Sequence, residues 1–81
     1  MHKLEWEQVG TGFRCHVDDL LDLLILDEGI GNIKEHMNRY SAHVVFHFIS
    51  NTYMIYINHY STIEACREIL VRWNNSRTSV N

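Results

Sequence analysis

Alternating apolar and polar residues mark the first part of the chain. Residues 3–9, KLEWEQV, place Leu4 and Trp6 on one side and two glutamates on the other, as in a strand with one face in water. The glycines of GTG at positions 10–12 interrupt this pattern, and FRCHV at 13–17 then alternates again. Two alternating runs around a glycine-rich turn predict a β-hairpin.

The next segment, VDDLLDLLILDEGIG at 17–31, is much richer in large apolar residues. Asp18 can cap a helix and Gly29 can close one in the left-handed conformation, which predicts a helix over about 19–28. Its apolar residues extend beyond the stripe of about 100° that an amphipathic surface helix buries. A buried strand over LLILD, residues 23–27, stays open as the alternative, because a short apolar run does not reveal its period.

Two further helices are predicted by their capping residues. Asn32, with Glu35 three positions later, can begin a short helix whose apolar residues recur at helical spacing up to Tyr40. Ser61 and Glu64 form a second capping pair ahead of the last helix. The predicted buried stripe of that last helix consists of Ile63, Cys66, Leu70 and Trp73.

The longest β-rich segment, SAHVVFHFISNTYMIYINHYS at 41–61, predicts a second hairpin around Ser50 and Asn51. A register in which Ile49 faces Thr52 gathers the core-forming side chains on one face. That face would hold Val44, Phe46, Phe48, Tyr53, Ile55 and Ile57. The other face would hold His43, Val45, His47, Met54, Tyr56 and Asn58. A slip by one residue would mix the two sets and bury the histidines.

The predicted elements follow the order β-β-α-α-β-β-α. This order favours an α+β fold, in which a small antiparallel sheet of two hairpins carries the helices on one face. We expect residues 1–75 to form a single α+β domain and residues 76–81 to form a frayed C-terminal tail.

Composition and charge narrow the class of protein. The 81 residues are 46% hydrophobic, which is typical of a globular chain, and the formal net charge is −3. We expect no direct nucleic-acid binding, because phosphate recognition needs a basic patch. We also expect no membrane association, because the apolar run is interrupted by Asp22 and is too short to span a bilayer. The charged N-terminus, MHKLEWE, does not fit a secretory signal, so we expect a cytoplasmic protein with reduced cysteines.

The candidate chemical groups are histidines and cysteines, and their spacing favours no catalytic site. His43 and His47 lie four residues apart on one strand, roughly 13 Å at about 3.3 Å per residue, which is too far to share a metal. Cys15 lies in the acidic third of the chain, where a thiolate nucleophile would not be stabilised. We therefore predict no enzyme, no metal and no cofactor. A histidine-dependent metal site or enzyme is the least favoured alternative.

Two surfaces are candidates for protein contacts. An acidic cluster near the leucine run could face a basic partner, and the open sheet face carries apolar and aromatic side chains. The predicted partner-binding residues are Asp18, Asp19, Asp22, Asp27, Glu28, Val45, His47, Met54 and Tyr56. The apolar residues on the second side of the 19–28 helix need a further surface, which a second copy supplies most simply. This predicts a homodimer with Leu21, Ile25 and Leu26 at its interface.

These features favour a non-enzymatic binding protein, a homodimeric inhibitor or regulator that covers a surface of a larger protein partner. Small acidic chains without catalytic motifs are common among phage-encoded inhibitors of host systems, anti-CRISPR proteins included. That analogy is one of size and composition alone. The alternative function is a dimeric protein that sequesters a nucleotide-type small ligand through Tyr56, His47 and Asn58.

Overall fold

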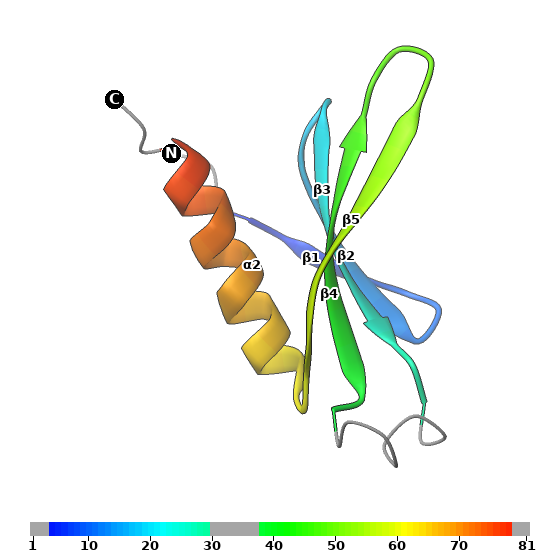
Figure 1. Cartoon of the computed structure of the whole chain (residues 1–81), viewed down its shortest axis with the longest axis vertical. Coiled ribbons are helices and arrows are strands. Elements are labelled where there is room, and N and C mark those ends of the chain that lie inside the picture. Colours follow the sequence, from blue (N-terminus) through cyan, green and yellow to red (C-terminus); the bar gives the residue numbers. More distant parts are fainter. Residues whose placement is uncertain (1–3, 30–37, 79–81) are drawn as a thin grey trace.

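A five-stranded antiparallel sheet with one helix on one face forms the fold. The computed structural model describes residues 4–29 and 38–78. These residues form β1 (Trp6–Val9), β2 (Gly12–Asp18), β3 (Leu21–Asp27), β4 (Tyr40–His47), β5 (Thr52–Tyr60) and α2 (Ile63–Thr78). The strands neighbour one another in chain order, and α2 crosses one face of the sheet (Figure 1).

The apolar run predicted as a helix over 19–28 is strand β3, so the β-β-α-α-β-β-α order is wrong. β3 is the central strand, and Leu21, Leu23 and Ile25 alternate onto the side that α2 covers. Each of these side chains is at most 1% exposed. Leu24 and Leu26 lie on the opposite face, where Leu24 is half-buried and Leu26 is exposed. Apolar residues therefore occupy both faces of β3, which is why they exceed one helical stripe. The alternative of a buried strand over residues 23–27 is confirmed.

Asp18 and Gly29, the predicted helix caps, serve instead at the two ends of β3. Oδ1 of Asp18 accepts a hydrogen bond of 2.8 Å from the backbone N–H of Leu20, in the turn from β2 to β3. Gly29 has a φ of 80°, and its N–H donates to Oδ1 of Asp27 at 2.9 Å. Asp side chains accept backbone N–H groups in turns as well as at helix ends, so these residues are compatible with either element.

The other helix predicted in the middle of the chain, from Asn32 to Tyr40, falls mostly on residues 30–37, which lie outside the described residues. The predicted end of this helix is not helical, because Tyr40 begins β4.

The C-terminal helix is confirmed, with a small shift of its first residue. α2 begins at Ile63. Its capping residue is Thr62 rather than Ser61, because Oγ1 of Thr62 accepts a hydrogen bond of 3.1 Å from the backbone N–H of Ala65. The helix continues to Thr78, beyond residue 75, where the domain was predicted to end. Residues 79–81 lie outside the described part of the chain.

The two hairpins are confirmed, but the second differs from its predicted register by two positions. Phe46 pairs with Tyr53, and Ile49 and Ser50 connect the strands. A shift of two residues keeps the side chains of residues 52–56 on their predicted faces, because side chains alternate with a period of two. The first hairpin turns at Gly10, whose φ is 62°.

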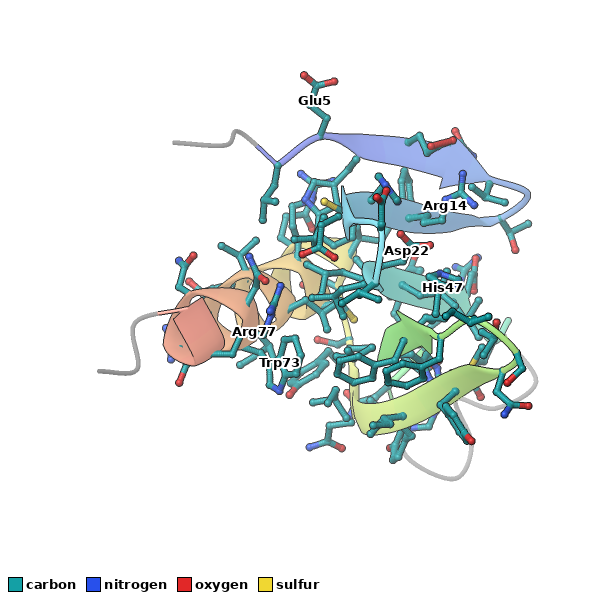
Figure 2. The ribbon with its side chains drawn as sticks, turned by 90° about the horizontal axis from the view of Figure 1, so that it is seen from above. Glu5, Arg14, Asp22, His47, Trp73 and Arg77 are labelled. Atoms are coloured by element: carbon teal, nitrogen blue, oxygen red, sulfur yellow. The ribbon has the colours of Figure 1, made fainter. Side chains whose placement is uncertain are left out.

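The hydrophobic core lies between α2 and the sheet. Its fully buried members are Cys15, Leu21, Leu23, Ile25, Ala42, Val44, Cys66 and Leu70. Half-buried aromatic side chains surround them, and Trp73 lies between α2 and the β4–β5 hairpin (Figure 2). α2 contacts β3, β4 and β5, but the loop end of the β4–β5 hairpin projects beyond it (Figure 1). One part of the sheet therefore lacks cover.

Candidate functional site

Three titratable side chains form a hydrogen-bonded group on the sheet face opposite α2. Asp22 of β3 lies between His16 of β2 and His47 of β4, and its side chain is only 9% exposed. Nδ1 of His16 is 2.8 Å from Oδ1 of Asp22, and Nε2 of His47 is 2.9 Å from Oδ2. An ionised carboxylate only accepts hydrogen bonds, so both rings donate an N–H to it. The group therefore ties three neighbouring strands together.

This group has the geometry of a structural clamp, because its hydrogen bonds join side chains of three neighbouring strands. Each imidazole directs one nitrogen at the shared carboxylate, so the remaining nitrogens, Nε2 of His16 and Nδ1 of His47, lie on the far sides of their rings. Among the described residues, no set of three histidine, cysteine or acidic side chains could hold a metal ion. The chemistry of the group is therefore hydrogen bonding between strands.

Asp22→Ala is expected to lower the free energy of unfolding by about 1–3 kcal/mol, because two imidazoles lose a charged acceptor. His16→Ala should cost less, since that ring is 60% exposed and water can replace the bond. Urea unfolding monitored by circular dichroism measures both values. If Asp22→Ala unfolds within about 0.5 kcal/mol of the wild type, which is usual for a surface substitution, the clamp contributes nothing.

A second polar network lies further along the same face. Oε2 of Glu28 is 3.1 Å from Nε2 of His59, whose Nδ1 is 2.6 Å from the hydroxyl of Tyr56. Glu28 also accepts a hydrogen bond from Ser41, and Oγ of Ser41 is 2.8 Å from Nε2 of His43. The hydrogen bonds from Ser41 and His59 lower the pKa of Glu28. Desolvation lowers the pKa of His43, so burial favours the neutral form of this ring.

A serine, a histidine and a glutamate in contact raise the question of a hydrolytic triad, and the geometry excludes one. The carboxylate of Glu28 bonds Ser41 and His59 rather than His43, the ring next to the serine hydroxyl, which is the wrong order for activating a nucleophile. Ser41 is fully buried, so a substrate cannot reach its hydroxyl. Nδ1 of His43 is also buried, and the described residues offer it no hydrogen-bond partner.

Glu28→Gln should reduce stability at neutral pH by an amount that shrinks as the pH falls. The folded pKa of Glu28 lies below its ordinary value of 4.5, so the unfolded chain binds this proton first. The stabilising contribution is therefore complete above about pH 4.5 and is lost as the pH falls through the folded pKa. Urea unfolding of both proteins between pH 7 and pH 3 measures the difference. Glu68→Gln, on the exposed side of α2, is the control. A difference for Glu28→Gln that does not change with pH would contradict this.

Most of the acidic residues predicted as a contact face already form hydrogen bonds or ion pairs with other residues of the chain. Arg39 binds both oxygens of Asp27, with Nε at 2.7 Å and Nη2 at 2.9 Å, and this contact lowers the pKa of Asp27. Asp18 caps its turn and lies 3.6 Å from Nη2 of Arg77. Asp22 and Glu28 belong to the two networks above. Asp19 is exposed in the β2–β3 turn, so these residues do not form one free acidic surface.

The residues predicted for a dimer interface are mostly in the core. Leu21 and Ile25 are buried by α2 and the sheet, and Leu26 is 36% exposed. The physical reason for placing a second copy against Leu21 and Ile25 is therefore removed, because their own chain already covers them.

The two thiols are equally inaccessible. Cys15 and Cys66 are free and fully buried, and burial raises the pKa of Cys66 to about 11. Neither sulfur is a reactive nucleophile in the folded protein.

Six of the nine large apolar side chains that are exposed in the described residues gather on the projecting half of the β4–β5 hairpin, whereas Val9, Leu20 and Leu26 lie apart from them. We call these six the hairpin surface, which consists of Phe48, Ile49, Tyr53, Met54, Ile55 and Tyr56. Each is between 48% and 108% exposed. Met54 and Tyr56 were predicted as contact residues and are exposed, whereas Val45, predicted beside them, is buried at 8%.

The sequence analysis assigned three members of the hairpin surface, Phe48, Tyr53 and Ile55, to the core, and it placed Ile49 beside the turn without predicting a contact there. Phe48 and Tyr53 do lie on the helix side of the sheet, and their rings contact each other edge to face at 5.7 Å. α2 does not reach that end of the hairpin, so these rings stay half exposed. The sequence does not reveal that the sheet is longer than the single helix that covers it, and this length difference is what exposes these rings.

Neither a hollow along α2 nor a comparison with known proteins adds a further candidate site. A shallow, open hollow of about 450 Å³ along α2 is lined by Glu64, Arg67, Glu68, Val71, Arg72 and Asn75, all from one helix. In the described ranges, no helix is long and apolar enough to cross a membrane. No family model, curated protein or solved structure matches the chain.

Proposed function

We propose that this chain is a non-enzymatic protein-binding module that acts by occupying a surface of a protein partner through its β4–β5 hairpin. The observation that carries the proposal is the hairpin surface itself. Its apolar side chains lie on both faces of the projecting hairpin, with Tyr53 and Ile55 on the helix side and Met54 and Tyr56 on the other. Soluble monomers rarely gather large exposed apolar side chains in this way, and such groups mark interaction sites. Aromatic side chains and methionine, which make up much of this surface, are enriched at protein interfaces.

The positions of the histidine and serine side chains support a protein that acts by covering a surface of its partner. The imidazoles of His16 and His47 are committed to Asp22, and the hydroxyl of Ser41 is buried. A regulator or inhibitor that covers a surface of a larger protein needs none of these groups to reach solvent.

The contacts of the residues named for the small-ligand alternative favour the protein-binding proposal over it. His47 is hydrogen-bonded to Asp22, while Tyr56 bonds His59. These two side chains therefore belong to separate networks and do not converge on one ligand.

Site-specific photocrosslinking in the cells that make the protein tests the proposal. A benzophenone side chain at Ile49, the most exposed member of the hairpin surface, should give protein adducts on irradiation. The matched control carries the same group at Glu68, on the exposed side of α2. Adducts with a different protein at position 49 but not at position 68 support a hairpin-directed binding module. Absence of adducts at position 49, or equal adducts at both positions, overturns it.

A further inference from the structure

Strand β5 is an open edge of the sheet, and its sequence lacks the usual protection of an edge strand. It has nine residues, and within residues 4–29 and 38–78 it pairs with β4 alone. Residues 48–58 contain no aspartate, glutamate, lysine, arginine or proline. Natural edge strands are blunted by charges, prolines or very short length, because unpaired N–H and C=O groups recruit other strands. An edge without these devices is open to pairing with another strand.

The hairpin geometry shows which backbone groups face outward. Phe48 and Asn51 exchange hydrogen bonds across the turn, with N···O distances of 2.7 and 3.4 Å. Hydrogen-bonded and non-hydrogen-bonded pairs alternate along an antiparallel ladder. Tyr53 and Ile55 therefore direct their N–H and C=O groups at β4. The backbone groups of residues 52, 54 and 56 point to the open edge.

The usable stretch of this edge ends at a bulge. Tyr56 pairs with His43 and Asn58 with Ala42, so Ile57 is the extra residue in β5. A bulge bends its strand and interrupts regular pairing. The straight part is therefore residues 52–56, which includes all four exposed apolar residues of β5.

We infer that the occupant of this edge is a second copy of the same chain, paired antiparallel through residues 52–56. In the register centred on Met54, Met54 faces Met54 of the second copy, and Thr52 faces Tyr56. The backbone N–H groups of residues 52, 54 and 56 then donate hydrogen bonds across the two-fold axis, and their C=O groups accept them. The intervening pair places Tyr53 against Ile55, an aromatic and a β-branched residue, which is a favourable cross-strand combination. No like charges meet, because the stretch carries none.

The opposite edge of the sheet explains why the assembly would stop at two. β1 is only four residues long and carries Glu7, which is 3.3 Å from Arg14 of β2. A head-to-tail contact between β5 and β1 would leave free edges and grow into a fibre, whereas β5 with β5 closes across a two-fold axis. The short, charged β1 and the long, uncharged β5 thus favour the closed pair.

The inference names the partner at part of the hairpin surface and so rests on the proposed function. It moves the dimer contact from the leucines of β3 to β5. The tip residues Phe48 and Ile49 lie outside the paired stretch, which leaves them available to a further protein.

Light scattering and disulfide trapping test the pairing. The wild-type protein should have twice the 9.6 kDa mass of one chain at high micromolar concentration. Met54→Lys places two ammonium groups across the axis and should raise the dissociation constant at least about tenfold, a free-energy change of about 1.4 kcal/mol. Val9→Lys, at an exposed apolar position on β1, should leave the dimer unchanged.

Met54→Cys should form a disulfide between two copies when a mild oxidant such as copper phenanthroline is added. Facing Cα atoms of a hydrogen-bonded antiparallel pair are about 5.5 Å apart, which suits a disulfide. Thr52→Cys should not link to itself, because position 52 of one copy faces position 56 of the other. The native cysteines are buried and do not compete.

The outcomes separate this inference from the proposed function. A monomeric wild-type protein overturns the pairing even if position 49 still crosslinks to another protein. A dimer that Met54→Lys leaves intact, or that Thr52→Cys traps instead of Met54→Cys, also overturns it. If Met54→Lys fails to fold by circular dichroism, the wild-type mass and the two cysteine variants still decide. A dimer whose position 49 crosslinks nothing supports the pairing and rejects the binding module.

Discussion

Leu23→Ala is expected to lower the free energy of unfolding by about 2–5 kcal/mol, the usual cost of removing a buried leucine side chain. Leu23 is fully buried in the middle of the central strand, between the sheet and α2. The surrounding strands are held by ladders on both sides, so the cavity can collapse only partly. A loss of this size is a large part of the stability of a domain of this length.

Leu20→Ala is the matched control and should change stability by no more than about 0.5 kcal/mol. Leu20 lies in the β2–β3 turn and is 57% exposed. A helix over 19–28 would bury both leucines, whereas the strand buries only Leu23. Thermal and urea unfolding of the two variants therefore separate the two structures. Similar losses in both would contradict β3.

Gly12→Ala is expected to cost about 2–4 kcal/mol, because an added Cβ has no space. It would collide with the backbone carbonyl oxygen of Ile25 in β3. A backbone atom of the central strand cannot move aside as the end of a side chain can. The substitution should therefore shift β2 away from β3 and weaken the sheet.

Gly10→Ala provides the comparison for Gly12→Ala. Gly10 has a φ of 62°, but nothing lies within 4 Å of an added Cβ. Its cost is the left-handed backbone alone, about 1–2 kcal/mol. Urea unfolding measures both variants. Gly12→Ala tolerated as well as Gly10→Ala would mean that β2 and β3 are not in close contact at this point.

The sequence predicts the elements whose period is clear. Both hairpins alternate over enough residues to be recognised, and the stripe of Cys66 and Leu70 places α2 correctly. β3 was predicted only as the alternative to a helix, because its run is too short and too apolar to reveal a period. Asp18 and Gly29 then favoured a helix, although they stabilise turns here.

The candidate site was predictable only in part. Exposure of Met54 and Tyr56 follows from their place on the outer face of β5. The histidine clamp could not be predicted, because His16 and His47 meet Asp22 only when residues 21–27 form a strand between them. A helix in that segment would place Asp22 away from both rings.

Amide hydrogen exchange along β5 tests the central claim, that this edge is the contact surface, most directly. The account predicts that the N–H groups of Tyr53 and Ile55 are protected at every protein concentration, because they bond β4. Those of Met54 and Tyr56 should be protected at high concentration and should exchange freely on dilution, when the second copy leaves. Rapid exchange of Met54 and Tyr56 at all concentrations, with Tyr53 and Ile55 still protected, would show an edge that no second copy covers and would contradict the account.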